Sequence, residues 1–270
     1  MRDDTWRDRD FYGYDGIVHA AGLVHQPRTR AEEYGRVNRD LTLAVAGKGK
    51  DEGVKQFILM STMAVYGRES ELGRINEIGG DTSVRPRSLY GKSKYEAEIG
   101  ALQLENEDFS VCIIRAPMVY GPGCPGNYGS LRRIALSFGL APALENRRSA
   151  VFIGNLCEYI RLLIAGEERG LFCPRDNEDL CTASVMDWIA GEQGRVLRRS
   201  KLLGAAIRCL APVLPAAGKA FGNLTYAPGL SVIPADTYCL WDLREAIKVT
   251  ETAWDAPSPF EAILDNRAIR

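Results

Sequence analysis

Tyr90 and Lys94 stand four residues apart, and a tyrosine and a lysine at this spacing can together perform acid/base chemistry. On a helix the two side chains lie one turn apart on the same face. A phenol with a reference pKa of about 10 is a poor base near neutral pH. An ammonium held beside it favours the phenolate and lowers that pKa. We therefore predict that Tyr90 is an acid/base catalyst tuned by Lys94.

A hydroxyl group suited to the same chemistry lies upstream, at Thr62. The apolar run from Gln56 to Met60 predicts a short buried strand, which leads directly into Ser61 and Thr62. Ligands of open α/β sheets collect at the carboxyl ends of parallel strands. We therefore expect Thr62 to share a substrate hydroxyl with Tyr90.

With several further motifs, these residues resemble the extended short-chain dehydrogenase/reductase family, whose members include NAD-dependent nucleotide-sugar epimerases and dehydratases. The order and spacing of the motifs fit that family along most of the chain. The matching segments are His19-Ala20-Ala21-Gly22 after an expected strand, Asn38, Thr62, Tyr90 with Lys94, the strand and turn from Ile113 to Gly123, Gly126-Asn127, and the run from Arg147 to Leu156.

The resemblance implies an α/β fold with two parts. The first is a doubly wound parallel-sheet Rossmann-like domain, truncated at its N-terminus, and the second is a smaller C-terminal substrate-binding cap. We expect residues 1–121 to form the partial dinucleotide-binding domain, with 151–174 returning to it. Residues 122–150 and 175–270 would then form the cap.

The resemblance also implies roles for individual residues. The catalytic residues would be Tyr90, Lys94 and Thr62. The cofactor would be NAD, with NADP left open, and its expected contacts are Ala20, Ala21, Gly22, Tyr90, Lys94, Pro117 and Val119. Substrate would be held by Thr62, Asn127 and Arg148, and the planar fork of an arginine suits a diphosphate. We expect Asn38 to be a structural hydrogen-bonding residue and His19 a satisfied strand-end histidine, with neither of them catalytic.

A dinucleotide-binding half normally opens with a strand, a Gly-x-x-Gly-x-x-Gly turn and a helix whose N-terminus holds the pyrophosphate. We expect this chain to lack that turn. Residues 1–8 resemble the polar segment after the family's third strand, so roughly 55 to 60 residues would be missing. A start codon assigned too late and a truncated gene both stay open.

The mechanism implied by the resemblance is epimerisation at C4 of a UDP-sugar through a transient 4-keto intermediate. Two alternatives stay open: an NAD(P)H-dependent reductase of a 4-keto nucleotide sugar, and a cofactor-free inactive or binding protein. Dehydration is disfavoured, because the related dehydratases carry an Asp-Glu pair after the catalytic threonine, where this chain has Met63-Ala64.

Composition excludes several other classes of function. The chain has 34 basic and 35 acidic residues and a net charge of −1, which gives no electrostatic case for nucleic-acid binding. Its 2 histidines offer little material for a zinc site, so we predict no metal. The 7 cysteines contain no Cys-x-x-Cys and indicate reduced thiols in the cytoplasm.

Residues 202–224 form the one stretch that is apolar enough to be considered as a transmembrane helix. Arg208, Pro212, Pro215 and Lys219 interrupt it, so we predict no transmembrane segment. We favour an amphipathic helical lid over the sugar site, and attachment to a lipid surface is the alternative. The family often forms homodimers through a helical face, and the helix expected at 87–105 has the right place for one.

Overall fold

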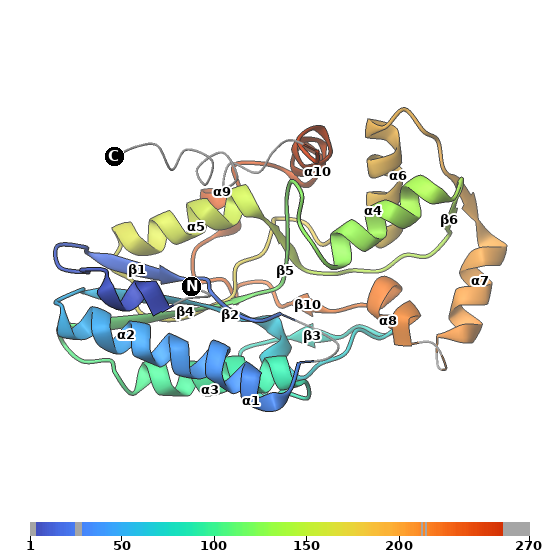
Figure 1. The fold of residues 1–270 in the computed structure, drawn as a ribbon. Coiled ribbons are helices and arrows are strands. Elements are labelled where there is room, and N and C mark those ends of the chain that lie inside the picture. The colour runs from blue at the N-terminus through green and yellow to red at the C-terminus, as the bar shows by residue number, and fades with distance from the viewer. Residues whose placement is uncertain (1–3, 25–28, 212, 214, 256–270) are drawn as a thin grey trace.

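A four-stranded parallel sheet forms the centre of the computed structural model, which describes residues 4–24, 29–211, 213 and 215–255 (Figure 1). The strand order is β1-β2-β4-β8, and every neighbouring pair is parallel. This confirms the expected parallel-sheet α/β fold. The bounds are β1 (Gly16–His19), β2 (Gln56–Thr62), β4 (Ser110–Ala116) and β8 (Gly170–Phe172).

Helices cover both faces of this sheet (Figure 1). On one face lie α1 (Ala31–Tyr34), α2 (Leu41–Asp51) and α3 (Leu89–Leu102), and on the other lies α5 (Ile153–Ala165). Side chains of a strand alternate between faces. Accordingly Phe57 and Leu59 pack with the core beneath α2 and α3, whereas Ile58 between them packs with the core beneath α5. Burial on both faces explains why β2 reads as a continuous apolar run.

A second layer at the carboxyl end of the sheet contains α4 (Asn127–Ser137), α6 (Thr182–Glu192) and α10 (Leu243–Thr252) (Figure 1). Its core is shared by α4, α6 and α10, and three pairs of short parallel strands tie it together. Because β8 pairs with β4, the chain returns to the central sheet after β7. The division at 1–121, 122–150, 151–174 and 175–270 stays a prediction. The other elements are η1 (Asp4–Asp8), η2 (Gly35–Asp40), η3 (Met63–Tyr66), β3 (Glu77–Ile78), β5 (Met118–Tyr120), β6 (Leu140–Pro142), β7 (Ala150–Phe152), β9 (Arg198–Ser200), α7 (Lys201–Leu210), α8 (Pro215–Phe221), β10 (Thr225–Tyr226) and α9 (Ala235–Tyr238).

The expectation that the chain lacks a Gly-x-x-Gly-x-x-Gly turn is wrong for the spacing itself. Gly123, Gly126 and Gly129 have this spacing and connect β5 to α4. Gly123 and Gly126 adopt positive φ angles of 62° and 89°, which glycine tolerates. β5, however, pairs with β7 outside the four-stranded sheet. This turn therefore leads into the second layer and does not open a dinucleotide-binding unit of the central sheet.

The apolar stretch at 202–224 is broken into two short helices, α7 and α8. Residues 212 and 214 of that stretch lie outside the described residues. Over the part of the chain that the structure describes, no helix has the length and apolar character needed to cross a bilayer.

Candidate active site

Thr62 is the last residue of β2, where the strand turns into the short helix η3. Its backbone is still extended, and its hydroxyl oxygen accepts a hydrogen bond from the backbone amide of Ala64 at 3.2 Å. Threonine is a favoured residue at such a helix start because its side chain satisfies an otherwise unpaired amide. The hydroxyl is thereby held at the carboxyl end of a central strand, as the sequence predicted.

Tyr90 lies in the first turn of α3, which begins after the capping residue Ser88. The side chain of Thr62 influences the pKa of the Tyr90 phenol, so the structure brings these two predicted catalytic residues near each other. Burial raises the pKa of the Tyr90 phenol, and the side chain of Thr62 opposes that rise. The expected lowering of this pKa by Lys94 is absent: burial has the largest effect, and Lys94 is not among the groups that shift the pKa.

A glycine makes the approach of Tyr90 to Thr62 sterically feasible. A Cβ atom on Gly91 would lie 2.8 Å from the backbone oxygen of Ala64, which is closer than real Cβ atoms come to backbone. Ala64 is also the residue whose amide binds the Thr62 hydroxyl. The glycine thus lets the start of α3 pack directly on the turn that carries Thr62.

Lys94 is buried, with 3% of its surface exposed. Burial lowers the pKa of its amine to about 8, and the nearby carboxylate of Glu98 opposes this shift. The Nζ atom lies 3.8 Å from the position that a Cβ on Gly22 would occupy. Among the described residues, no hydrogen bond or ion pair of the Lys94 amine is found. A buried amine with a strongly perturbed pKa and no protein partner is characteristic of a binding or catalytic group.

Asn38 holds the segment after β1 against α3. Its side-chain oxygen accepts from the Leu23 amide at 2.6 Å, and its side-chain nitrogen donates to the Leu23 carbonyl and to Ser93, both at 3.0 Å. These contacts hold Leu23 against the helix that carries Lys94, and the preceding Gly22, one of the predicted cofactor residues, lies beside the Lys94 amine. Asn38, which lies in the π-helical segment η2, therefore makes structural hydrogen bonds, as expected.

His19, at the end of β1, differs from the expectation of a satisfied histidine. Its ring is buried and stacks on Phe57, and within the described residues neither ring nitrogen has a hydrogen-bond partner. Burial and the neighbouring Lys94 lower its pKa to about 4, so the ring is neutral near pH 7. The sequence could not reveal this, because a satisfied histidine and an unpartnered one have the same strand-end position.

A buried ion pair that the sequence analysis missed lies beneath the predicted catalytic residues. Glu98, one helical turn after Lys94, accepts from the Arg115 guanidinium at 2.7 Å and from the hydroxyl of Ser61. Arg115 also donates to the Tyr66 hydroxyl at 3.0 Å. The network connects α3 to the ends of β2 and β4. The only signal in the sequence was the position of Glu98 on the helix face shared by Tyr90 and Lys94.

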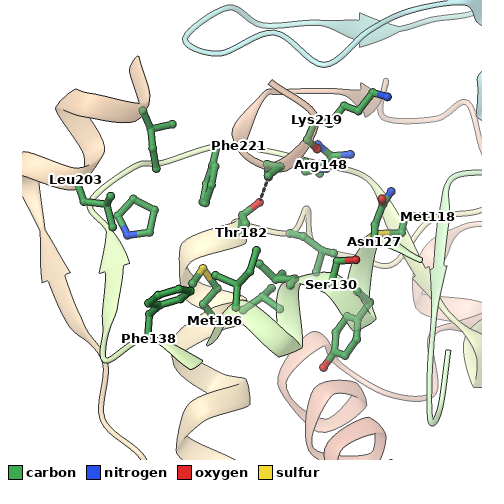
Figure 2. A pocket seen from close by; sticks show the side chains of 18 of the residues that line it. Met118, Asn127, Ser130, Phe138, Arg148, Thr182, Met186, Leu203, Lys219 and Phe221 are labelled. Atoms are coloured by element: carbon green, nitrogen blue, oxygen red, sulfur yellow. Dashed lines mark hydrogen bonds between the residues drawn. The ribbon is translucent and has the colours of Figure 1, made fainter. Parts of the chain in front are cut away.

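The two predicted substrate residues, Asn127 and Arg148, line a cavity of about 640 Å³ in the cap (Figure 2). Met118 of β5 lines the same cavity, so the strand that carries Val119 leads from the catalytic region to this space. Pro117 is buried at the junction of β4 and β5. The structure therefore places Thr62, Tyr90 and Lys94 around the strand ends, and Asn127 and Arg148 at the cavity of the second layer.

Arg148 is partly buried, and burial lowers the pKa of its guanidinium. Its side chain donates to Ser70 at 3.4 Å and to the carbonyl of Lys219. Acidic partners of this guanidinium are not found among the described residues, whereas the neighbouring Arg147 pairs with Asp179 at 2.9 Å. Burying a charge without a counterion is costly, so Arg148 has the properties of an anion-binding residue. Groups of histidine, cysteine and carboxylate side chains able to hold a metal were sought in the described part of the chain, and none was found.

The comparisons with known proteins agree with one another in pointing to NAD-dependent epimerases. The model of the NAD dependent epimerase/dehydratase family matches residues 2–169, more than half of the chain. A UDP-glucose 4-epimerase from Vibrio cholerae is 33% identical over 186 residues, covering 64% of this chain and 56% of the relative. The N-acetyl-alpha-D-glucosaminyl-diphospho-ditrans,octacis-undecaprenol 4-epimerase of Escherichia coli O157:H7 is 30% identical over 168 residues, covering 60% of this chain and 49% of the relative. The chain thus spans about half the length of these two relatives.

Among solved structures, the UDP-glucuronic acid 4-epimerase from Bacillus cereus in complex with NAD is similar, with a TM-score of 0.69. The identity is 15%, and the match covers 94% of this chain and 79% of the other. At this identity the match shows a shared fold.

Because His19 is neutral when folded, its titration should make stability depend on pH. The folded pKa of about 4 is below the ordinary value of 6.5, so between these values the unfolded chain binds more protons and stability falls as pH falls. Urea unfolding at pH 7 and pH 5 should show that the wild type loses about 2 kcal/mol more than the His19→Phe variant. Equal losses in the two proteins would contradict a buried neutral histidine.

Proposed function

Because the chain belongs to the NAD dependent epimerase/dehydratase family, we propose that it epimerises a UDP-sugar at C4 through a transient 4-keto sugar, with NAD as cofactor. The observation that carries the proposal is the proximity of Thr62 and Tyr90 at the carboxyl end of β2, with Tyr90 on the helix face shared with the buried Lys94. Both named relatives are 4-epimerases, which favours epimerisation over net reduction.

The residues around Lys94 fit the nicotinamide end of NAD. The buried amine of Lys94 and the ring nitrogens of His19 are polar groups without partners among the described residues. Gly22 is packed so closely against Asn38 that a Cβ would lie 3.1 Å from its side-chain oxygen, and small residues there let a cofactor approach the backbone. Ala20, Ala21, Gly22, Lys94, Pro117 and Val119 are the residues that we propose hold it.

The proposed mechanism assigns a separate task to each catalytic side chain. Tyr90 as phenolate takes the proton of the sugar 4-hydroxyl, and Thr62 holds that oxygen by a hydrogen bond. Bound NAD supplies the chemistry of accepting a hydride from C4 and returning it. Burial raises the pKa of the Tyr90 phenol, so in the proposed mechanism the positive charge of protonated Lys94 has to oppose that rise and favour the phenolate. Burial lowers the pKa of Lys94 to about 8, which leaves most of it protonated at neutral pH. Tyr90 returns the proton when the sugar is reduced on its other face.

The diphosphate of the substrate would bind at the polar end of the cap cavity. Arg148 presents a partly buried guanidinium there without a carboxylate partner, and Asn127 stands in the first turn of α4. Arginine and phosphate oxygens form charge-assisted hydrogen bonds, often in pairs. This arrangement leaves the sugar to extend past Met118 toward Thr62 and Tyr90.

We also propose that the protein is cytoplasmic and homodimeric. All seven cysteines are free thiols, which is typical of proteins kept in a reducing compartment. On α3, the helix expected at the dimer interface, Ile99 and Leu102 are 44% and 45% exposed. Burying such apolar side chains favours association. Light scattering on the purified protein should give the mass of a dimer, and a monomeric mass would refute this part of the proposal.

The Tyr90→Phe variant tests the assignment of the acid/base. Loss of a positioned acid/base group should lower kcat for UDP-sugar epimerisation at least about 100-fold, since the remaining ring cannot exchange a proton. The matched control is Tyr95→Phe on the same helix, which should retain wild-type kcat. Circular dichroism should show both variants folded. Wild-type turnover by a folded Tyr90→Phe variant would contradict the mechanism.

Two adjacent arginines give a matched test of the diphosphate site. Arg148→Gln should raise KM for a UDP-sugar by about tenfold or more, because a charge-assisted hydrogen bond is lost. Arg147→Gln should leave KM nearly unchanged, since Arg147 is exposed and binds Asp179. Equal effects of the two substitutions on KM would show that Arg148 does not contact the substrate.

A further inference from the structure

The outer side of helix α7 is an apolar surface that the cavity of the second layer does not use. Figure 1 shows α7 at the outer edge of this layer, beyond α4 and α6. We propose that α7 and the basic residues beside it dock the protein on the surface of an anionic lipid bilayer. This docking is independent of the proposed function, since its residues lie outside the catalytic and diphosphate sites.

One side of α7 is packed against the rest of the protein. Gly204 is buried on that side, and a Cβ atom on it would lie 2.9 Å from the backbone oxygen of Ala143. The helix backbone therefore lies directly against the chain that follows β6. Leu203 and Ile207, on the same side, line the apolar wall of the cavity. These contacts determine which side of α7 is left facing solvent.

The solvent-facing side of α7 is apolar as well. With 3.6 residues per turn, Leu202, Ala206 and Cys209 lie on the side opposite Gly204. All three are exposed, and Leu202 exposes 82% of its surface. Val213, shortly after the helix, is 74% exposed. A helix that is apolar on both sides is normally buried on both, so the outer side of α7 lacks its cover.

Exposed basic side chains accompany this apolar face. Lys201 and Arg208 lie two turns apart on α7, and Arg195 and Arg198 come shortly before it. Among the described residues, none of these four forms an ion pair. From residue 193 to residue 235 the sequence has six basic and no acidic residues, although the whole chain has 34 and 35. Each basic side chain at an anionic membrane surface strengthens binding about fivefold.

The strands next to α7 extend the same surface. Arg198 of β9 is paired in register with Leu140 of β6, which is 47% exposed. Phe138, two residues before Leu140, is 64% exposed, and Val196, two residues before Arg198, is 87% exposed. Exposed apolar side chains thus alternate with exposed arginines along this edge. Helices that lie in the interface of a bilayer combine the same two kinds of residue.

The combination of charge and apolar surface favours a bilayer over two other occupants. In a symmetric contact between two copies of the chain, the same surface lies on both sides, so the basic residues around α7 would face each other and repel. A soluble polyanion would satisfy the charges but would not bury the exposed leucine and valine side chains. An anionic bilayer offers negative headgroups and a hydrocarbon interior at the same surface.

Co-sedimentation of the purified protein with lipid vesicles tests the charges. Vesicles of equal parts phosphatidylglycerol and phosphatidylcholine should bind the wild type at least about tenfold more tightly than phosphatidylcholine alone. Lys201→Gln combined with Arg208→Gln should weaken binding to the mixed vesicles by about tenfold or more. The matched control is Arg161→Gln combined with Arg169→Gln, which removes the same charge from exposed positions in and after α5 and should leave binding unchanged.

A second pair of variants tests the apolar face. Leu202→Gln should weaken binding to the mixed vesicles by about tenfold, because a leucine side chain is no longer buried among the lipids. The control Ile164→Gln changes an exposed apolar residue of α5 and should have no effect. Circular dichroism should show that both variants are folded.

Two exposed cysteines allow the contact to be located. Cys209 lies on α7 and Cys157 lies on α5. A polarity-sensitive fluorophore on Cys209, in the Cys157→Ser variant, should shift its emission to shorter wavelength when mixed vesicles are added. The same fluorophore on Cys157, in the Cys209→Ser variant, should show no shift.

The outcomes separate the bilayer from the other occupants. Absence of vesicle binding, equal binding to both kinds of vesicle, or undiminished binding by the α7 variants would overturn the inference. Binding to heparin but not to vesicles would also overturn it, in favour of a soluble polyanion. A mass that falls by half in Leu202→Gln would overturn it in favour of a second copy of the chain. Epimerisation of a UDP-sugar is measured without vesicles, so each of these results leaves the proposed function intact.

Discussion

The buried ion pair between Glu98 and Arg115 is the interaction on which the arrangement of the catalytic residues depends. It joins helix α3 to the middle of the central sheet, and Ser61 and Tyr66 complete its hydrogen bonds. Ser61 precedes Thr62 in β2, and Glu98 follows Lys94 by one turn of α3. Removing one partner of such a pair typically costs about 3–5 kcal/mol, because the other charge is left buried. The network therefore fixes the strand that carries Thr62 relative to the helix that carries Tyr90 and Lys94.

Near the Glu98–Arg115 network and in the second layer, several polar groups have no partner among the described residues. Lys94 is buried without a counterion contact, His19 has two unpartnered ring nitrogens, and Arg148 has no carboxylate. Each of these costs stability, and structures retain such groups mainly where a ligand completes them. Their positions follow the route from the strand ends through β5 into the cap, which is the path that a cofactor and a diphosphate-linked sugar would occupy together.

The sequence predicted the parts of this arrangement that depend on local pattern. The apolar run at Gln56 predicted β2, and the spacing of Tyr90 and Lys94 predicted a shared helix face. The sign of the Tyr90 pKa shift was wrong, because burial by residues distant in sequence decides it. The glycine spacing at 123–129 was missed, and spacing alone does not say which sheet a turn serves. The Glu98 and Arg115 pair and the apolar cavity join residues far apart in sequence, so neither has a local signature.

The central claim is that C4 of a sugar is oxidised and reduced again within one site. The most direct measurement follows deuterium placed at C4 of a UDP-sugar during turnover by the purified protein with NAD. Because the hydride goes to the cofactor and returns to the same sugar, the 4-epimer should keep the deuterium at C4, and no nicotinamide should be consumed. Loss of the label to solvent, or consumption of one reduced nicotinamide for each product formed, would contradict the account.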